Sequence, residues 1–568
     1  MKTLPEVDTL IVGGGWVGLL LAKELASRTS RQVVVLERGP ARKTSDYLDD
    51  MDELDFAIRL KMMTDVRHET ITFRHSAKDR ALPVRQHGSF LPGTGVGGSG
   101  EHWSGISYRY LPEAFRILSY YRERYGEKKL PPGHALRDWG IGYDELEPYY
   151  WRAEQMLGLS GKAGNLRGKK IEGGNIFEGP RSHEFPTPPM KMPYLAAMFR
   201  DATKQMGFHP YPMPAATISQ TFRNPDGVLR SGCVYCGYCE RFGCMIGAKA
   251  QPSNTLVPVI NKKKNAQIRT GCWVRKVVIE GGKARAVVFV DEKGEEFLQP
   301  ANTVVLASWS INNTRLLLLS GLNGPMVGKN LTHQVSGAAA TMFFEKPLNR
   351  FIGAGSAGQS IGDYDGDTID HTNLPFLGGA LLYTVCYGFR PMANFGVVPS
   401  NVKASWGSDW KKAALHWYDR TGRLSLYGDH FAYQQNYMDL DPTYTDRYGD
   451  PLIRFTLDWT DNERQLAAYM SAKGVEIAKA MGAKEITQLP ALRHYDSTRY
   501  QSTHIQGGAI MGASPDTSVV NTYQQHWTVK NLFVIGASAF PHSPSSNPTL
   551  TALALTYRTA DAMVDRKV

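Results

Sequence analysis

Four of the six cysteines in this chain crowd into one short stretch. They follow the spacing C-x2-C-x2-C-x4-C and are Cys233, Cys236, Cys239 and Cys244. Glycines beside them allow several thiolates to turn toward one point, which a strand or helix would prevent. Thiolates are soft ligands that suit zinc or iron–sulfur clusters. Structural zinc usually takes two ligand pairs separated by a longer loop, so these three-residue steps favour an iron–sulfur cluster.

Zinc, disulfides and free thiols are the alternatives at this cysteine loop, residues 233–244. Disulfides are disfavoured because cysteines this close together cannot all bridge without strain. The spacing leaves open which three or four of the sulfurs would bind a cluster.

The N-terminus carries a second chemical motif. Residues 8–12 are predicted to form a buried strand, Gly13-x-Gly15-x-x-Gly18 follows, and residues 19–26 have a helical pattern. In a dinucleotide fingerprint the first glycine permits a tight turn, the second admits a pyrophosphate and the third brings helix and strand together. The N-terminus of the following helix favours the anion. The order of elements predicts a dinucleotide site.

An acidic residue completes this fingerprint. The apolar run 33–36 predicts a second strand, and Glu37 at its end lies 24 residues after the first glycine, where it can bind ribose hydroxyls. The chain holds a second match, Gly353-x-Gly355-x-x-Gly358. That match lacks a clear preceding strand and a following helix, so it is interpreted as a glycine-rich loop.

Length and composition indicate a multidomain globular protein. A chain of 568 residues is too long for one core, and 42% apolar with 21% charged residues excludes general disorder. The net charge is +11, but the basic residues are scattered and Lys262-Lys263-Lys264 is the one tight basic run. Nucleic-acid binding would require a basic stripe with interleaved aromatics, and none is found in the sequence.

No membrane-spanning helix is predicted, because no stretch reaches 18 uninterrupted apolar residues. Residues 9–26 resemble the apolar part of a signal peptide, but their glycine spacing fits the dinucleotide site better. The chain is therefore expected to carry no export signal of its own.

Longer motifs identify a family resemblance. PGTGVGGSGEHWSG begins at Pro92 and NLFVIGASAFPHSPSSNPTLTALAL begins at Asn531, and residues 304–321, 327–331 and 506–512 agree with them. Together with the N-terminal fingerprint they resemble the glucose–methanol–choline (GMC) oxidoreductase family over most of the chain. The resemblance implies FAD as cofactor and the oxidation of an alcohol.

Within that family, VYCGYCERFGC, EHWSG and YDELEPYY resemble flavoprotein subunits of bacterial membrane-bound sugar and sugar-acid dehydrogenases of the gluconate 2-dehydrogenase type. Glycoside 3-dehydrogenases and fructose dehydrogenases are the alternatives. The resemblance implies a three-iron cluster, with a four-iron cluster as alternative, which passes electrons from FAD to a cytochrome c partner. It also implies a small subunit that carries the export signal, and a periplasmic location attached to the membrane through these partners, with the cytoplasm as alternative.

The resemblance assigns cofactor contacts residue by residue. Gly97, Gly98 and Ser99 match the loop beside the flavin, and His102 and Trp103 follow it. Glycines there suit close approach of the backbone to a flat ring. The other implied contacts are Val274, Ala537, Pro548 and Thr549.

His504 matches the active-site histidine of the family, and Asn547 matches its partner, which is histidine or asparagine. Oxidising an alcohol requires removal of the hydroxyl proton while a hydride leaves the adjacent carbon for the flavin. A neutral histidine suits the proton transfer, and an amide orients the substrate oxygen. His542, His102 and His333 have weaker claims, since structural hydrogen bonding explains them at least as well.

These sites need elements to position them. The expected fold is α/β, or α+β overall, with a Rossmann-like FAD-binding domain made of residues 1–110, 220–335 and 500–568, which includes the cysteine loop. Residues 111–219 are expected to be a helical and loop-rich insertion around 143–157. Residues 336–499 are expected to form a substrate domain on an antiparallel sheet, with alternating runs at 437–441 and 452–457.

Two other functions compete with a dehydrogenase. An oxidase would pass electrons directly to oxygen, which the cysteine loop argues against. A non-catalytic flavoprotein would only relay electrons between partners. The sequence does not specify the substrate, the carbon oxidised, covalent attachment of FAD or the subunit stoichiometry.

Overall fold

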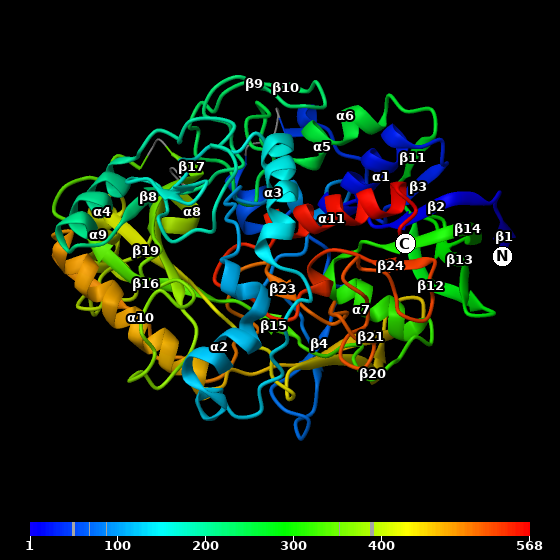
Figure 1. The fold of residues 1–568 in the computed structure, drawn as a ribbon. Coiled ribbons are helices and arrows are strands. Elements are labelled where there is room, and N and C mark those ends of the chain that lie inside the picture. The colour runs from blue at the N-terminus through cyan, green and yellow to red at the C-terminus, as the bar shows by residue number, and fades with distance from the viewer. Residues whose placement is uncertain (48–51, 68, 87, 351–352, 387–390) are drawn as a thin grey trace.

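The computed structural model describes residues 1–47, 52–67, 69–86, 88–350, 353–386 and 391–568 (Figure 1). Parallel strands form the centre of its first sheet, and their apolar side chains are largely buried. This matches the near-continuous apolar runs expected of strands covered on both faces. The parallel strands are β11 (Ala266–Arg269), β3 (Val33–Leu36), β2 (Val7–Val12), β14 (Glu296–Leu306) and β24 (Leu532–Val534).

Helices from both ends of the chain cover this sheet. The helix α1 (Trp16–Arg28) begins directly after β2, and α11 (Thr549–Val564) packs against it, while α3 (Tyr143–Leu157) packs on α11 (Figure 1). The hairpin of β12 (Trp273–Glu280) and β13 (Lys283–Val290) extends the sheet through antiparallel pairing with β14.

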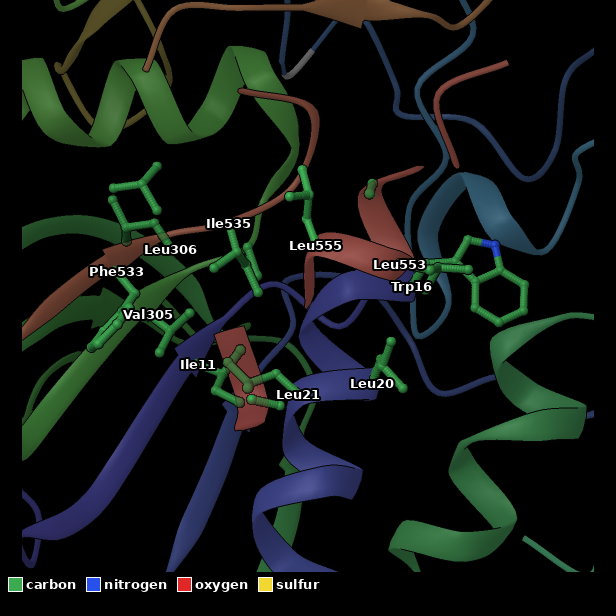
Figure 2. Close-up of a cluster of buried hydrophobic side chains, with 14 of the residues drawn as sticks. Ile11, Trp16, Leu20, Leu21, Val305, Leu306, Phe533, Ile535, Leu553 and Leu555 are labelled. Carbon is green, nitrogen blue, oxygen red and sulfur yellow. The ribbon is translucent and has the colours of Figure 1, made fainter. Parts of the chain in front are cut away.

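The core of this part joins segments that are distant in sequence (Figure 2). Ile11 of β2, Val305 of β14 and Phe533 of β24 lie in one buried cluster with Leu20 of α1 and Leu553 of α11. Burying each such side chain contributes about 1.5–3 kcal/mol relative to exposure. The two ends of the chain therefore fold as one unit around the glycine turn.

A second sheet is antiparallel and carries its own core. The helix α10 (Asp461–Ala480) packs on it, and α4 (Tyr194–Gln205) packs near its other edge (Figure 1). Thr460 and Glu463 form a capping box that starts α10. In order, the strands are β22 (Glu485–Gln488), β16 (Val335–Phe343), β19 (Thr421–Gly428), β18 (Ala380–Cys386), β17 (Ala354–Ile361) and β8 (Pro210–Pro212).

The interpretation of the second glycine match as a loop was wrong. Gly355 and Gly358 lie within strand β17, and Gly353 pairs with Cys236 in an isolated bridge next to it. A Cβ atom on Gly358 would lie 1.9 Å from the Thr384 carbonyl oxygen. Glycine is therefore required there because neighbouring backbone approaches closely, as is usual for glycine inside strands.

A smaller sheet joins the two halves of the chain. The expected runs 437–441 and 452–457 form the antiparallel pair β20 (Tyr437–Thr445) and β21 (Pro451–Thr456), outside the six-stranded sheet. β21 also pairs with β4 (Thr72–Arg74), which is followed by β5 (Leu82–Pro83). Two short segments therefore pair outside their expected domains. β4 and β5 come from the expected FAD-binding domain, and β4 pairs with β21 of the expected substrate domain. β8 comes from the expected insertion and pairs with β17 in the second sheet.

The remaining elements are short or peripheral. None of the helices in the described ranges is long and apolar enough to span a membrane. The remaining helices are α2 (Ile117–Tyr125), α5 (Pro252–Thr255), α6 (Val257–Ile260), α7 (Trp309–Leu319), α8 (Pro391–Asn394) and α9 (Gly407–Trp417). The remaining strands are β1 (Lys2–Thr3), β6 (Asn165–Leu166), β7 (Lys169–Lys170), β9 (Phe222–Arg223), β10 (Leu229–Arg230), β15 (Thr332–His333) and β23 (Ile505–Gln506).

Candidate active site

The glycine turn between β2 and α1 opens onto a cavity. Gly13 has φ of +109°, a conformation that favours glycine. Gly15 caps α1, and a Cβ atom there would have no neighbour within 4 Å, so the backbone faces open space. A Cβ atom on Gly18 would lie 2.1 Å from the Gly13 carbonyl oxygen. The three glycines thus form the turn, leave room for a ligand and permit close packing.

Glu37 is held at the end of β3 with its carboxylate fixed. Its Oε2 accepts a hydrogen bond from Gly14 N at 2.9 Å, and its Oε1 accepts one from Gly39 N at 2.9 Å. The side chain is buried at the wall of the cavity. A carboxylate placed there has further acceptor capacity for hydroxyl groups of a ligand.

The loop 97–103, here called the flavin loop, lies against the glycine turn. Gly97 N donates to Gly14 O at 2.6 Å, and Gly97 and Gly15 form an isolated parallel bridge. Both Gly97 and Gly98 have positive φ, and Ser99 Oγ accepts from Gly93 N at 3.0 Å. The two glycine-rich segments therefore form one continuous wall.

The resulting cavity has a volume of about 250 Å³ and fits a dinucleotide by the chemistry of its lining: bare glycine backbone, a helix N-terminus and a fixed carboxylate. Most of the predicted cofactor residues line it, namely Gly13, Gly15, Glu37, Gly97, Gly98, Ser99, Val274, Ala537, Pro548 and Thr549.

Three predicted cofactor residues stand behind this lining. Gly18 acts in packing, as described above. Trp103 donates from Nε1 to Ala250 O at 2.7 Å and contacts Trp16 edge to face. His102 is buried, and its Nε2 has no hydrogen-bond partner among the described residues.

The start of α7 contributes cavity residues that the sequence interpretation did not name. Trp309, Asn312 and Arg315 line the cavity, and Trp309 has a positive φ of 73°. The motif 304–321 could have indicated these residues, because a strand leads directly into a helix there, as it does at the N-terminal glycine turn.

His504 and Asn547 meet beside this cavity. Asn547 Nδ2 lies 3.2 Å from His504 Nε2, and His504 Nδ1 lies 2.6 Å from Gln334 Oε1. Because an amide oxygen can only accept, Nδ1 carries the proton and Nε2 keeps a lone pair. Thr503, Ile505 and Pro548, the sequence neighbours of this pair, line the cavity.

The environment of this pair keeps the histidine neutral. Burial lowers the pKa of His504 to about 3, and nearby His333 contributes in the same direction. The Tyr427 ring contacts His504 with centroids 5.4 Å apart. Asn547 Oδ1 is buried and has no hydrogen-bond partner among the described residues, so an acceptor is free at this point.

The other candidate histidines contact different groups and do not pair with Asn547. His333 Nδ1 lies 2.6 Å from the Tyr495 hydroxyl, and its Nε2 lies 3.0 Å from Ser502 Oγ. His542 packs edge to face on Trp139. Burial lowers the pKa of both histidines to about 3, so a depressed pKa does not by itself distinguish a base.

The cysteine loop packs under the second sheet. All four of its cysteines are free of disulfides, and Cys233, Cys239 and Tyr235 belong to one buried apolar cluster. Burial raises the pKa of Cys239 to about 11, while the Lys249 ammonium acts in the opposite direction. Backbone N–H groups approach two of the sulfurs, from Tyr235 to Cys233 Sγ at 3.3 Å and from Lys249 to Cys244 Sγ at 3.5 Å.

The described part of the chain shows no group of three or more His, Cys, Asp or Glu arranged around a single metal ion. That observation bears equally on a zinc ion and on an iron–sulfur cluster, because both require several converging ligands. The donor set still suits an iron–sulfur cluster: four thiols on one loop interact electrostatically, and N–H groups face the sulfurs.

Comparisons with known proteins identify the family of the chain. Family models described as GMC oxidoreductase match residues 187–336 and 432–556. The chain is 40% identical to a gluconate 2-dehydrogenase flavoprotein of Pantoea cypripedii, over 99% of this chain and 94% of that protein. It is 26% identical to the fructose dehydrogenase large subunit of Gluconobacter japonicus, over 99% and 98% of the two chains.

A solved structure shares the fold. Pyridoxine 4-oxidase from Mesorbium loti superposes with a TM-score of 0.62 at 16% identity, over 98% of this chain and 99% of that one. The protein therefore belongs to the GMC oxidoreductase family and is an FAD-dependent dehydrogenase that acts on CH–OH groups.

Proposed function

We propose that this chain oxidises a secondary alcohol of a sugar acid, in the manner of a gluconate 2-dehydrogenase. The pairing of His504 Nε2 with the Asn547 amide beside the cofactor cavity carries the proposal. Full-length similarity to the Pantoea cypripedii flavoprotein supports the substrate class. Similarity to the fructose dehydrogenase large subunit supports a sugar as the second candidate, and glycosides form a third.

The chemistry follows from the two side chains. FAD, when bound, supplies the acceptor for a hydride from the alcohol carbon. His504 Nε2 takes the hydroxyl proton, Gln334 holds the imidazole tautomer, and the Asn547 amide orients the substrate oxygen. A base placed in this way typically contributes about 10²–10⁴ in rate. In this proposal the cofactor is held by Gly13, Gly15, Glu37, Gly97, Gly98 and Ser99, and Gly18 packs α1 against the turn behind them.

The cysteine loop is proposed to hold an iron–sulfur cluster, three-iron by preference, through Cys233, Cys236, Cys239 and Cys244. When bound, such a cluster supplies one-electron steps between a two-electron donor and a one-electron acceptor. The grouping of four disulfide-free thiols with N–H groups facing the sulfurs supports this assignment.

The chain is further proposed to work with a cytochrome c and a small subunit at the periplasmic face of a membrane, attached through those partners. The support is that one relative is named as a large subunit, a term used for part of a complex.

Anaerobic mixing of the FAD-loaded chain with gluconate, fructose and a glycoside tests the catalytic proposal. Gluconate is expected to bleach the flavin absorbance fastest, and His504→Ala should slow bleaching by about 10²–10⁴. His526→Asn, a buried histidine away from the pair, is the matched control and should bleach at the wild-type rate. No bleaching by any alcohol would indicate a relay protein, and rapid oxygen uptake by the reduced protein would indicate an oxidase.

Iron content tests the cysteine loop separately. The purified chain is expected to contain iron by elemental mass spectrometry, and Cys236→Ser should lose most of it while keeping FAD. Cys272→Ser, a buried cysteine outside the loop, should keep its iron. Iron-free wild-type protein would refute the cluster without affecting the assignment of His504.

A further inference from the structure

A loop directly before α11 carries Asn547 and lies against one end of the second sheet. This loop, residues 541–548 and here called the asparagine loop, contains no helix or named strand. Asn547 Oδ1 has no hydrogen-bond partner among the described residues, so the backbone that carries the amide contributes to its orientation. The contacts of the asparagine loop therefore bear on how the amide meets His504.

The second sheet presents the ends of several strands to this loop. β16 and β18 begin at this end and β19 finishes there, because Val335 and Ala380 both pair with Gly428. Directly after β19, His430 N donates to Ser543 O at 2.9 Å, and Ser543 N donates to His430 O at 3.1 Å. The sheet and the asparagine loop are thus joined by backbone.

Asp429, the first residue after β19, binds the asparagine loop through its side chain. Its Oδ1 accepts a hydrogen bond from Ser545 N at 2.6 Å. Its Oδ2 accepts one from Gly379 N, directly before β18, at 2.8 Å. The side chain is buried. One carboxyl group therefore connects the sheet to a residue two positions before Asn547.

A second buried carboxyl group holds the same serine. Asp365 lies in the connection between β17 and β18, and its Oδ1 accepts a hydrogen bond from Ser545 Oγ. Ser545 thus donates with its backbone to Asp429 and with its side chain to Asp365. Two segments of the second sheet bind one residue of the asparagine loop.

Gln334 binds the same part of the loop through different groups. Its Nε2 donates to Pro544 O at 2.9 Å and to Ser546 O at 3.2 Å, on either side of Ser545. These contacts use carbonyl oxygens of the loop, whereas Asp429 accepts the N–H of Ser545. The two side chains therefore complement each other and do not duplicate one contact.

Fold stability alone does not explain two acids at one serine. Burial raises the pKa of both Asp365 and Asp429 above the usual range of aspartate. Their charged forms therefore oppose burial, a cost that an apolar residue at either position would avoid. What the two acids provide is a set of acceptors directed at Ser545, which an apolar side chain cannot supply.

We propose that Asp429 and Asp365 are positioning residues, which fix the asparagine loop against the second sheet and thereby set the place of the Asn547 amide beside His504. The fixing of the loop concerns only this chain. Its effect on catalysis rests on the proposed function, in which Asn547 orients the substrate oxygen. The sheet thus positions a catalytic group that a distant part of the chain carries.

The test compares Asp429→Asn and Ser545→Ala in the FAD-loaded full-length chain. Asp429→Asn leaves one amide oxygen for two N–H donors, so one of the hydrogen bonds is lost. Ser545→Ala is the milder change, because it removes only the donor to Asp365. Asp441→Asn is the matched control, since Asp441 is also buried and accepts from a hydroxyl and from backbone N–H groups, but in β20 of a different sheet.

Amide hydrogen exchange reports on the loop without reference to activity. A peptide covering residues 541–548 should exchange about tenfold faster in Asp429→Asn than in wild type. Ser545→Ala should lie between the two, and Asp441→Asn should match the wild type in this peptide. Wild-type exchange in both Asp429→Asn and Ser545→Ala would overturn the fixing role.

The limiting rate of anaerobic flavin bleaching reports on the amide. It is measured with whichever of gluconate, fructose and the glycoside bleaches fastest. Asp429→Asn should lower this rate by about 10–100-fold, with a smaller change in the substrate concentration that gives half of it. In an Asn547→Ala background, Asp429→Asn should lower the rate no further, because residues that act through one group are not additive. An equal fold loss in both backgrounds would overturn the positioning role.

These measurements separate the inference from the proposed function. Wild-type bleaching by Asn547→Ala would refute the catalytic role of Asn547 itself, and with it the catalytic effect of the two aspartates. If Asn547→Ala is slow while Asp429→Asn exchanges faster and bleaches at the wild-type rate, only the catalytic effect of the aspartates is refuted.

Discussion

At the scale of single residues, His504 is defined by what its two ring nitrogens contact. Gln334 accepts from Nδ1 at 2.6 Å, which leaves the Nε2 lone pair directed at Asn547. Burial lowers the pKa of this histidine to about 3. The base is therefore present in its proton-accepting form throughout the neutral range, and no activation by deprotonation is needed.

This depressed pKa predicts the pH dependence of flavin reduction. The neutral imidazole is fully present well above pH 3 and is lost only as the pH falls toward that value. The rate of anaerobic bleaching should therefore show no titration near the usual histidine pKa of about 6.5. Stopped-flow bleaching between about pH 5 and pH 8 measures this, and an acid limb near 6.5 that is absent in His504→Ala would contradict it.

Gln334 is predicted to matter although no motif identified it. Gln334→Leu removes the acceptor for Nδ1–H, and also the donor that binds Pro544 O at 2.9 Å and Ser546 O at 3.2 Å in the loop before Asn547. Misplacing the base and the amide together should slow bleaching by about 10–100-fold. Gln334→Glu, which keeps the acceptor, should lose less, and equal rates for the two variants would contradict the tautomer role.

At the scale of elements, different glycines of the turn between β2 and α1 serve helix packing and ligand binding. Gly18→Ala would place a methyl group 2.1 Å from Gly13 O, which forces α1 away from the turn. Overpacking of this kind costs about 1–3 kcal/mol. Denaturant unfolding of the FAD-free protein should therefore show a lower stability for Gly18→Ala.

Gly15→Ala is the matched control for that prediction. It has an ordinary φ of −86° and no neighbour within 4 Å of an added Cβ atom, so the FAD-free protein should keep wild-type stability. Because Gly15 lines the cavity, the same change should weaken FAD binding. Equal stability loss in both variants would show that the distinction is wrong.

Local patterns predicted individual strands and helices, although their packing partners are distant in sequence. The expected strand at 33–36 matches β3 in full, and the helix expected around 143–157 is α3. The glycine match at 353–358 failed because Gly358 is required by the distant backbone at Thr384. Gln334 was not identified for the same reason, since its contact with His504 is long-range.

At the scale of the whole molecule, the cofactor cavity joins both cores. Its lining combines the glycine turn of the first core with Trp309 and Ile505, which pack in the second. β4 and β21 form a further connection between distant parts of the chain. A ligand in this cavity therefore contacts elements from both halves, and its binding should stabilise them together.

FAD is accordingly predicted to control the stability of the molecule. A ligand that binds only the folded state at 100 times its Kd adds about 2.7 kcal/mol to the free energy of unfolding. The thermal midpoint of FAD-stripped protein should rise with added FAD and report one transition for both halves. Without FAD, the thermal midpoint of Gly15→Ala should equal that of the wild type. More FAD should then be needed to raise the midpoint of this variant. If only one half responded to FAD in hydrogen exchange, the cavity would not couple the two cores.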